Sequence, residues 1–376
     1  MLRVELFPPG WMGRSLQLLA IAVGGPEHLD RLSPDAALFP DKEAFIDLLL
    51  EAYSIAESIA LAKARKPQPR LYGNDTKPLK KLLGVKVTRW GDAARLLVER
   101  LEKGELDPGG PRVVAVMLTK LNIFEHLRAE AGAVKASGPA SQTTPAGLAL
   151  AMVGGLLAKM GAVGTTGVYL LPGPDTPLEA LDDIAPLYAV LALEPGEDTT
   201  PPLPYIFTPR TNNAPVSLDV LLTIYGASIL ADQFSEEEER LCGETRLNAL
   251  HMASISEAGN RPILAQLAPL SFSEPLCLLG TKALKTAGRL IHQALTRGIC
   301  RGGGLRGAAD PGSEAVLACT GKLYLYSMTG NNTFLYDCAR LIHQASTTKE
   351  CSGAKNLTWL LRSLRSTPPG REVQVT

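Results

Sequence analysis

Ten prolines lie between residues 172 and 215, and they separate two stretches of the chain with different apolar patterns. Proline fixes φ and removes a backbone donor, so a segment this rich in it is typical of a linker or of long surface loops. Apolar residues make up 45% of the 376 positions, which is enough to build a core on each side. We therefore expect a domain over residues 1–172, a proline-rich linker or long loops over 173–215, and a second domain over 216–376.

The first stretch mixes strand and helix signals. Residues 2–6 alternate apolar and charged side chains before a Pro-Pro-Gly turn, the pattern of a short half-buried strand. Residues 41–66 and 90–101 repeat apolar side chains at helical spacing, and residues 161–171 predict a strand bounded by glycines and a proline. We expect a mixed α/β domain here.

From Ser217 onward the apolar spacing is helical, beginning with Leu218, Leu221, Leu222 and Tyr225. The fold class expected for the whole chain is therefore α+β: a mixed α/β N-terminal domain followed by a mostly α-helical C-terminal domain.

A net charge of zero conceals a strong segregation of charge. Residues 63–89 carry nine basic side chains and one acid, Asp75, whereas residues 175–239 carry thirteen acids and only Arg210 as a base. Residues 240–376 return to sixteen basic and eight acidic side chains. A neutral chain of this kind presents one surface that attracts phosphate and another that repels it.

The basic stretch predicts a contact with nucleic acid. Pro67 and Pro69 end the preceding helix, and residues 76–83 predict a short helix with Lys77, Lys80 and Lys81 on one face. The alternative is a solvated, ion-rich surface of the kind common in thermophile proteins. A second cluster, at residues 210–213, supplies Arg and Asn, the usual readers of base edges. The candidate nucleic-acid-binding residues are Lys63, Arg65, Lys66, Arg70, Lys77, Lys80, Lys81, Lys86, Arg89, Arg210, Asn212 and Asn213.

A hexapeptide is repeated in the second half of the chain, at residues 289–294 and 340–345. At the same offset of 51 (340 − 289), Cys300 matches Cys351. A duplicated helical unit explains the identities, and a zinc site made of His292, Cys300, His343 and Cys351 is the alternative. Buried thiols and disulfides both remain open for the six cysteines, since intracellular disulfides are rare outside hyperthermophiles.

Catalytic motifs are not evident. The sequence has neither a phosphate-binding G-x-x-x-x-G-K-[ST] loop nor a G-x-S-x-G nucleophile turn. Residues 302–307 satisfy G-x-G-x-x-G but follow a predicted helix instead of a strand, so a basic surface loop fits better than a nucleotide-binding enzyme. We expect a protein that is not an enzyme, with no cofactor and no metal.

The apolar stretches around residues 16–23 and 146–158 are shorter than a typical membrane span, and the first residues lack the pattern of a secretory signal. We expect a cytoplasmic protein with no membrane partner.

Diffuse patterns extend over most of the length: the opening strand before Trp11-Met12-Gly13, the basic middle, the segment 216–222, and the late segments 323–330 and 334–342. In these patterns the chain resembles the large-subunit proteins of the archaeal type I-A CRISPR surveillance complex (the Csa4 family). The resemblance implies a non-catalytic subunit that contacts target DNA and its adjacent motif and supports antiviral defence. The implied partners are the guide RNA-protein complex, target DNA and other CRISPR effector subunits. The competing hypotheses are a nucleotide-using enzyme built on residues 302–307 and a helical protein-interaction scaffold.

Overall fold

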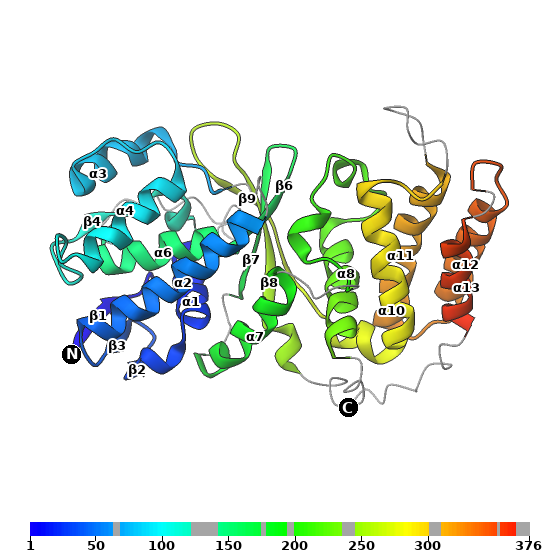
Figure 1. Cartoon of the computed structure of the whole chain (residues 1–376), viewed down its shortest axis with the longest axis horizontal. Coiled ribbons are helices and arrows are strands. Elements are labelled where there is room, and N and C mark those ends of the chain that lie inside the picture. The colour runs from blue at the N-terminus through cyan, green and yellow to red at the C-terminus, as the bar shows by residue number, and fades with distance from the viewer. Residues whose placement is uncertain are drawn as a thin grey trace, which may run out of the picture. The chain divides into compact units, whose positions relative to one another are not determined.

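The computed structural model describes residues 1–62, 68–121, 142–173, 178–193, 199–234, 245–300, 310–351 and 354–365, and it confirms the α+β fold class. The chain divides into two compact units (Figure 1). Unit 1 comprises Met1–Tyr188 and Ala249–Ala268, and unit 2 comprises Ala189–Asn248 and Pro269–Thr376.

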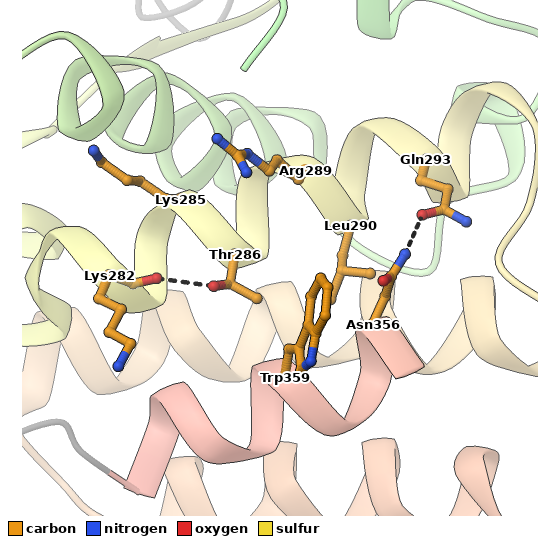
Figure 2. Close-up of a pocket in the computed structure, with 8 residues that line it drawn as sticks. All are labelled: Lys282, Lys285, Thr286, Arg289, Leu290, Gln293, Asn356 and Trp359. Carbon is orange, nitrogen blue, oxygen red and sulfur yellow. Dashed lines mark hydrogen bonds between the residues drawn. The ribbon is translucent and has the colours of Figure 1, made fainter. Parts of the chain in front are cut away.

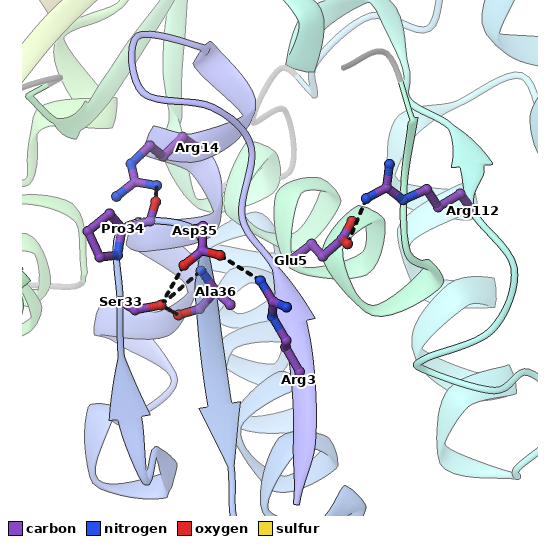
Figure 3. A network of polar contacts seen from close by, with 8 residues as sticks. All are labelled: Arg3, Glu5, Arg14, Ser33, Pro34, Asp35, Ala36 and Arg112. Carbon is purple, nitrogen blue, oxygen red and sulfur yellow. Dashed lines mark hydrogen bonds and ion pairs between the residues drawn. The ribbon is translucent and has the colours of Figure 1, made fainter. Parts of the chain in front are cut away.

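Unit 1 begins with a small antiparallel sheet of order β1-β3-β2. The strands are β1 (Leu2–Glu5), β2 (Arg31–Leu32) and β3 (Ala36–Phe39), and Leu2 of β1 pairs with Phe39 of β3. Figure 3 shows the ion pairs at this sheet: Arg3 donates to Asp35 at 2.5 Å, and Arg112 donates to Glu5 at 2.7 Å. These four charges line a cavity of about 290 Å³ and compensate one another, so the cavity presents no net charge to a ligand.

Two apolar helices, α1 (Met12–Val23) and α6 (Pro145–Ala158), form the core of unit 1. Every residue of α1 is buried, and the two helices pack so closely that a Cβ at Gly154 would overlap the backbone carbonyl of Leu16. Gln17 is fully buried in α1, where it accepts from the Phe7 N–H at 2.7 Å and donates to the Gly147 carbonyl at 2.9 Å. A buried polar side chain with paired donor and acceptor thus ties the two helices to the chain after β1.

Further helices pack on this core. They are α2 (Lys42–Ala62), α3 (Gly73–Leu83) and α4 (Trp90–Glu102), and both α2 and α4 contact α6. Trp90 is fully buried at the start of α4, and its indole N–H donates to the Met152 carbonyl at 2.7 Å. The remaining elements of this region are η1 (Pro26–His28), η2 (Met117–Lys120) and the paired strands β4 (Val113–Val114) and β5 (Gln142–Thr143).

A second sheet of unit 1 has the order β6-β7-β8-β9. Its strands are β6 (Lys159–Val163), β7 (Thr166–Pro172), β8 (Leu250–Ser256) and β9 (Ile263–Pro269), and Figure 1 shows β8 beside β7 despite their distance in the sequence. β8 lies where the sequence predicted helix. Its residues are mostly buried, and Ile255 is its only β-branched residue, so pairing with β7 in register from Thr166–Ser256 to Pro172–Leu250 decides its structure.

The region expected to be linker contains regular structure. It holds η4 (Leu178–Ala180), α7 (Leu181–Ala192), η5 (Leu203–Ile206) and η6 (Thr211–Asn213). Leu203 and Ile206 are fully buried, so this part of the chain contributes apolar side chains to the core of unit 2.

Unit 2 is built mainly from helices that pack side by side (Figure 1). They are α8 (Leu218–Gln233), α10 (Ser273–Thr296), α11 (Pro311–Thr329), α12 (Thr333–Ser346) and α13 (Lys355–Arg365), with η7 (Thr245–Asn248) before β8. Gly280 interrupts α10 with a φ of 73°, a left-handed conformation that glycine adopts without steric cost. Gly288 allows α10 to approach Ser228 of α8 closely.

Two disulfides between described residues link parts of unit 2: one joins α11 to α12, and the other joins the segment after α10 to the segment after α12. Cys300 pairs with Cys351 and Cys319 pairs with Cys338, and within the described ranges no cluster of His, Cys, Asp and Glu fits a metal ion. The hypothesis of a zinc site at His292, Cys300, His343 and Cys351 is therefore wrong, because disulfide sulfurs are no longer thiolate ligands. The separation of Cys300 and Cys351 equals the offset of the repeated hexapeptide, so the disulfide joins equivalent positions of the two copies.

Among the residues that the structure describes, none of the helices has both the length and the apolar character needed to cross a membrane.

Replacing Cys300 and Cys351 together by alanine is expected to lower the free energy of unfolding by about 4 kcal/mol, because the disulfide closes a loop of about 50 residues in the unfolded chain. Denaturant titration of the oxidised protein measures the change. The pair Cys319→Ala and Cys338→Ala is the matched control, and its shorter loop predicts a loss smaller by about 1 kcal/mol. Equal unfolding midpoints for the wild type and the Cys300/Cys351 variant would contradict the assignment.

Asp310 caps α11, where its carboxylate accepts from the Gly312 and Ser313 N–H groups at 3.1 Å and from the Ile299 N–H at 2.7 Å. Burial alone would raise the pKa of this carboxyl, but the bonds from Ser313, Ile299 and Cys300 outweigh burial and lower the pKa. A lowered pKa in the folded state means that the charged form adds stability above the unfolded pKa of about 3.9, and that this stability is lost at lower pH.

Asp310→Asn is therefore expected to destabilise unit 2 by about 1 kcal/mol at neutral pH. The difference from wild type should shrink as the pH falls from about 5 through the lowered pKa of Asp310. Thermal unfolding across this pH range tests the sign. A difference that grows on acidification would show that Asp310 is not stabilised as a carboxylate.

Candidate nucleic-acid interface

The basic segment of unit 1 enters α3 through a tight hydrogen-bonded turn. The Asp75 carboxylate accepts from the Tyr72 N–H at 2.9 Å at the start of the helix and from the Met117 N–H at 2.8 Å. One side chain thus satisfies a buried backbone N–H at the start of α3 and a part-buried one at the start of η2. The helix ends at Gly84, whose φ of 66° is left-handed. The sequence predicted this helix over residues 76–83, and the structure begins it at Gly73.

The lysines of α3 lie opposite its buried face. Asp75, Leu79 and Leu83 are buried at intervals of one turn, whereas Lys77, Lys80 and Lys81 are exposed. At a helical period of 3.6 residues, the three ammonium groups share the solvent face. Lys86 and Arg89 are also exposed in the segment between α3 and α4. We call Lys77, Lys80, Lys81, Lys86 and Arg89 the α3 cationic surface.

Asp75, the single acid of residues 63–89, does not belong to this surface because it is only 2% exposed. Burial raises the pKa of its carboxyl, although the hydrogen bonds from Tyr72 and Met117 and the charge of Lys120 act to lower it. The acid therefore serves the fold, and no acidic side chain of this segment reaches the solvent face of α3.

The ion pairs found among the described residues include none that involves the α3 cationic surface. In the neighbouring helix α4, by contrast, Arg95 pairs with Glu99 at 3.2 Å, and Arg100 pairs with Glu105 at 3.9 Å. Cations without a local counter-charge are available to neutralise phosphate groups, and the release of the cations condensed on the nucleic acid then favours binding.

Arg70, another candidate, has a structural role. Its guanidinium donates to the Glu257 carbonyl at 2.5 Å and lies 5.4 Å from the centre of the Tyr72 ring. The candidates Lys63, Arg65 and Lys66 lie outside the described residues, as does the glycine-rich segment 302–307.

The second candidate cluster belongs to unit 2. Asn212 and Asn213 are exposed in η6, while Arg210 donates to the Ala294 carbonyl at 3.1 Å near the end of α10. Arg210 also lies against Gly298 together with Asp310. The structure therefore assigns Arg210 a packing role at the end of α10 and leaves the two asparagine side chains at the surface.

A buried ion pair that sequence analysis missed fixes the segment before α3. Lys159 of β6 is 2% exposed, and its ammonium bonds both carboxylate oxygens of Glu257 at 2.6 Å and the Gln68 carbonyl at 3.0 Å. Tyr169 of β7 donates to the same carboxylate at 2.5 Å. Burial lowers the pKa of the Lys159 ammonium, although the charge of Glu257 opposes this shift. The pKa of the Tyr169 hydroxyl is raised, mainly by burial and also by the Glu257 carboxylate. The signal in the sequence was a lysine directly after the apolar run 146–158.

Comparison with protein-family models, with curated proteins and with solved structures finds no match for this chain. The interpretation of the α3 cationic surface therefore depends on its own geometry and charge.

Lys159→Met is expected to lower the free energy of unfolding by about 3–5 kcal/mol, because it leaves the Glu257 carboxylate without its cation in a poorly solvated site. The double variant Lys159→Met with Glu257→Gln should recover part of that loss, since no charge remains unpaired. Denaturant unfolding of the two single variants and the double variant gives the coupling. A Lys159→Met loss below about 1 kcal/mol, the range of exposed pairs, would contradict a buried pair.

Proposed function

We propose that this protein binds nucleic acid through the α3 cationic surface and that it acts without catalysing a reaction. The observation that carries the proposal is the exposure of Lys77, Lys80 and Lys81 on one helix face, while Asp75, the single acid of residues 63–89, is buried. Lysines contact phosphate groups as point charges, and such contacts supply affinity and register without reading sequence.

The proposed biological setting is a type I-A CRISPR effector complex, in which the chain is a subunit that contacts target DNA and its adjacent motif. This setting depends on the resemblance of the sequence to the large-subunit proteins of that complex. Its partners there are the guide RNA-protein complex and the other effector subunits, and its compartment is the cytoplasm. Sequence selection in such a complex comes from RNA pairing, so a protein subunit needs backbone contacts more than base contacts.

The phosphate contacts of the three lysines predict a specific change in salt dependence. Replacing Lys77, Lys80 and Lys81 by glutamine should reduce the slope of log affinity against log salt by about 2.7 for duplex DNA and by about 2 for a single strand. Fluorescence anisotropy with a labelled duplex and a labelled single strand, titrated with salt, measures both slopes.

The matched control is the variant Arg3→Gln, Arg95→Gln and Lys103→Gln, which removes the same number of charges from unit 1. Arg3 and Arg95 are paired with carboxylates, at 2.5 Å and 3.2 Å, and so are not available to phosphate. The control should keep the wild-type slope. Equal slopes for the α3 variant and the control, or wild-type binding that ignores salt, would rule out the proposed contact.

A further inference from the structure

Unit 2 contains a groove between α10 and α13 that the proposed function does not use. Its cavity measures about 300 Å³, at the lower end of the range of small-molecule sites. Lys282, Lys285, Thr286, Arg289, Leu290 and Gln293 line it from α10, and Asn356 and Trp359 line it from α13. Figure 2 shows the Trp359 ring beside the Leu290 side chain, and Asn356 reaching across to Gln293.

The walls of this groove are basic. After Glu274 in its first turn, α10 carries no acid, and α13 carries none at all. The only carboxylate that faces the lining cations among the described residues is that of Asp232, which lies 3.7 Å from Lys285 and 4.0 Å from Arg289. Asp232 is itself held by the backbone N–H of Thr200 at 2.7 Å. Among the described residues, three cations of the groove thus face one acid.

Lys282 differs from the other two cations. No ion pair of its ammonium occurs among the described residues, whereas Lys285 and Arg289 both lie near Asp232. Its side chain is exposed, as is that of Arg289, and Figure 2 shows it on the side of α10 that faces α13. An ammonium in this position is available to an anion that enters the groove.

The opposite wall offers a flat aromatic surface. Trp359 is 56% exposed, which is unusual for the largest apolar side chain, and it lies against the buried Leu290. The side-chain N–H of Asn356 donates to the side-chain amide oxygen (Oε1) of Gln293 at 3.1 Å, and this bond fixes an amide beside the ring. Together these groups suit a nucleotide. The aromatic plane can stack on the base, the fixed amide can hydrogen-bond the edge of the base, and the cation can pair with the phosphate.

We propose that the α10–α13 groove binds one nucleotide, with the base on Trp359 and the phosphate at Lys282. The nucleotide is either a free nucleoside monophosphate or one unit of a single strand, since both present the same chemistry. An acidic peptide would pair with the cations of the groove, but its carboxylates would make no stacking contact with the exposed indole ring of Trp359. The groove lies in unit 2 and the α3 cationic surface in unit 1, so neither site depends on the other.

The test is calorimetric titration of the full chain with AMP, adenosine and inorganic phosphate. AMP should bind, and adenosine and phosphate should each bind at least about tenfold more weakly, because each lacks one of the two contacts. Trp359→Ala and Lys282→Gln should each weaken AMP by about tenfold. Tyr336→Ala and Lys355→Gln are the controls, because they change an exposed aromatic residue and an exposed lysine of unit 2 outside the groove, and they should bind AMP as wild type does.

A second arm uses the variant with Lys77, Lys80 and Lys81 replaced by glutamine, so that binding through the α3 cationic surface does not contribute. If a 5′-phosphorylated oligodeoxyadenylate binds this variant, and adding Trp359→Ala abolishes that binding, the ligand of the groove is a single strand. If AMP binds and the oligonucleotide does not, the ligand is the free nucleotide. Three ligand results would overturn the proposal: AMP does not bind at millimolar concentration, phosphate binds as tightly as AMP, or polyglutamate displaces AMP. The proposal is also overturned if the groove variants bind AMP as their controls do while thermal melts show that all of them are folded.

Discussion

The buried ion pair between Lys159 and Glu257 connects three parts of unit 1 that are distant in sequence. It lies at the start of β6 and just after β8, and the same two residues bond the Gln68 carbonyl and the Arg70 guanidinium in the segment that leads into α3. The desolvation cost of such a pair is offset only when the remaining hydrogen-bonding positions are filled, as Tyr169 and the Gln68 carbonyl do here. These contacts hold the segment that leads into α3 against the sheet of unit 1.

Given that anchor, the chemistry of α3 follows from where its side chains point. Asp75 faces inward and holds the turn, so its charge is used in folding, and the lysines on the other face have no acid of the same segment beside them. Exposed lysines of this kind cost little stability, because they remain hydrated, and they keep the freedom to follow a phosphate backbone. Unit 2 offers a different chemistry, in which an aromatic plane and an amide accompany the positive charge.

The sequence predicted the features that depend on local pattern. The α+β class, the helices near residues 41–66 and 90–101 and the short lysine-bearing helix all follow from apolar spacing and from proline and glycine positions, with shifts of a few residues at the ends. Features that depend on tertiary pairing were not accessible. The β8 segment has little intrinsic strand preference, and its conformation is determined by pairing with β7. Domains predicted as consecutive segments of the sequence also could not assign residues 249–268 to unit 1, because the chain leaves that unit before residue 249 and re-enters it there. Lys159 and Asp75 likewise bond residues far away in the sequence: Glu257 is 98 positions from Lys159, and Met117 is 42 positions from Asp75.

The central claim is that the α3 cationic surface is where nucleic acid contacts the protein, and residue-level lysine footprinting tests it most directly. Acetylation of the free protein and of the protein saturated with duplex or single-stranded DNA, followed by peptide mass spectrometry, reports the reactivity of each lysine. The account predicts strong protection of Lys77, Lys80 and Lys81 in the complex, while Lys103, exposed on the same unit, reacts as before. Unchanged reactivity of the three α3 lysines at saturating DNA would contradict it.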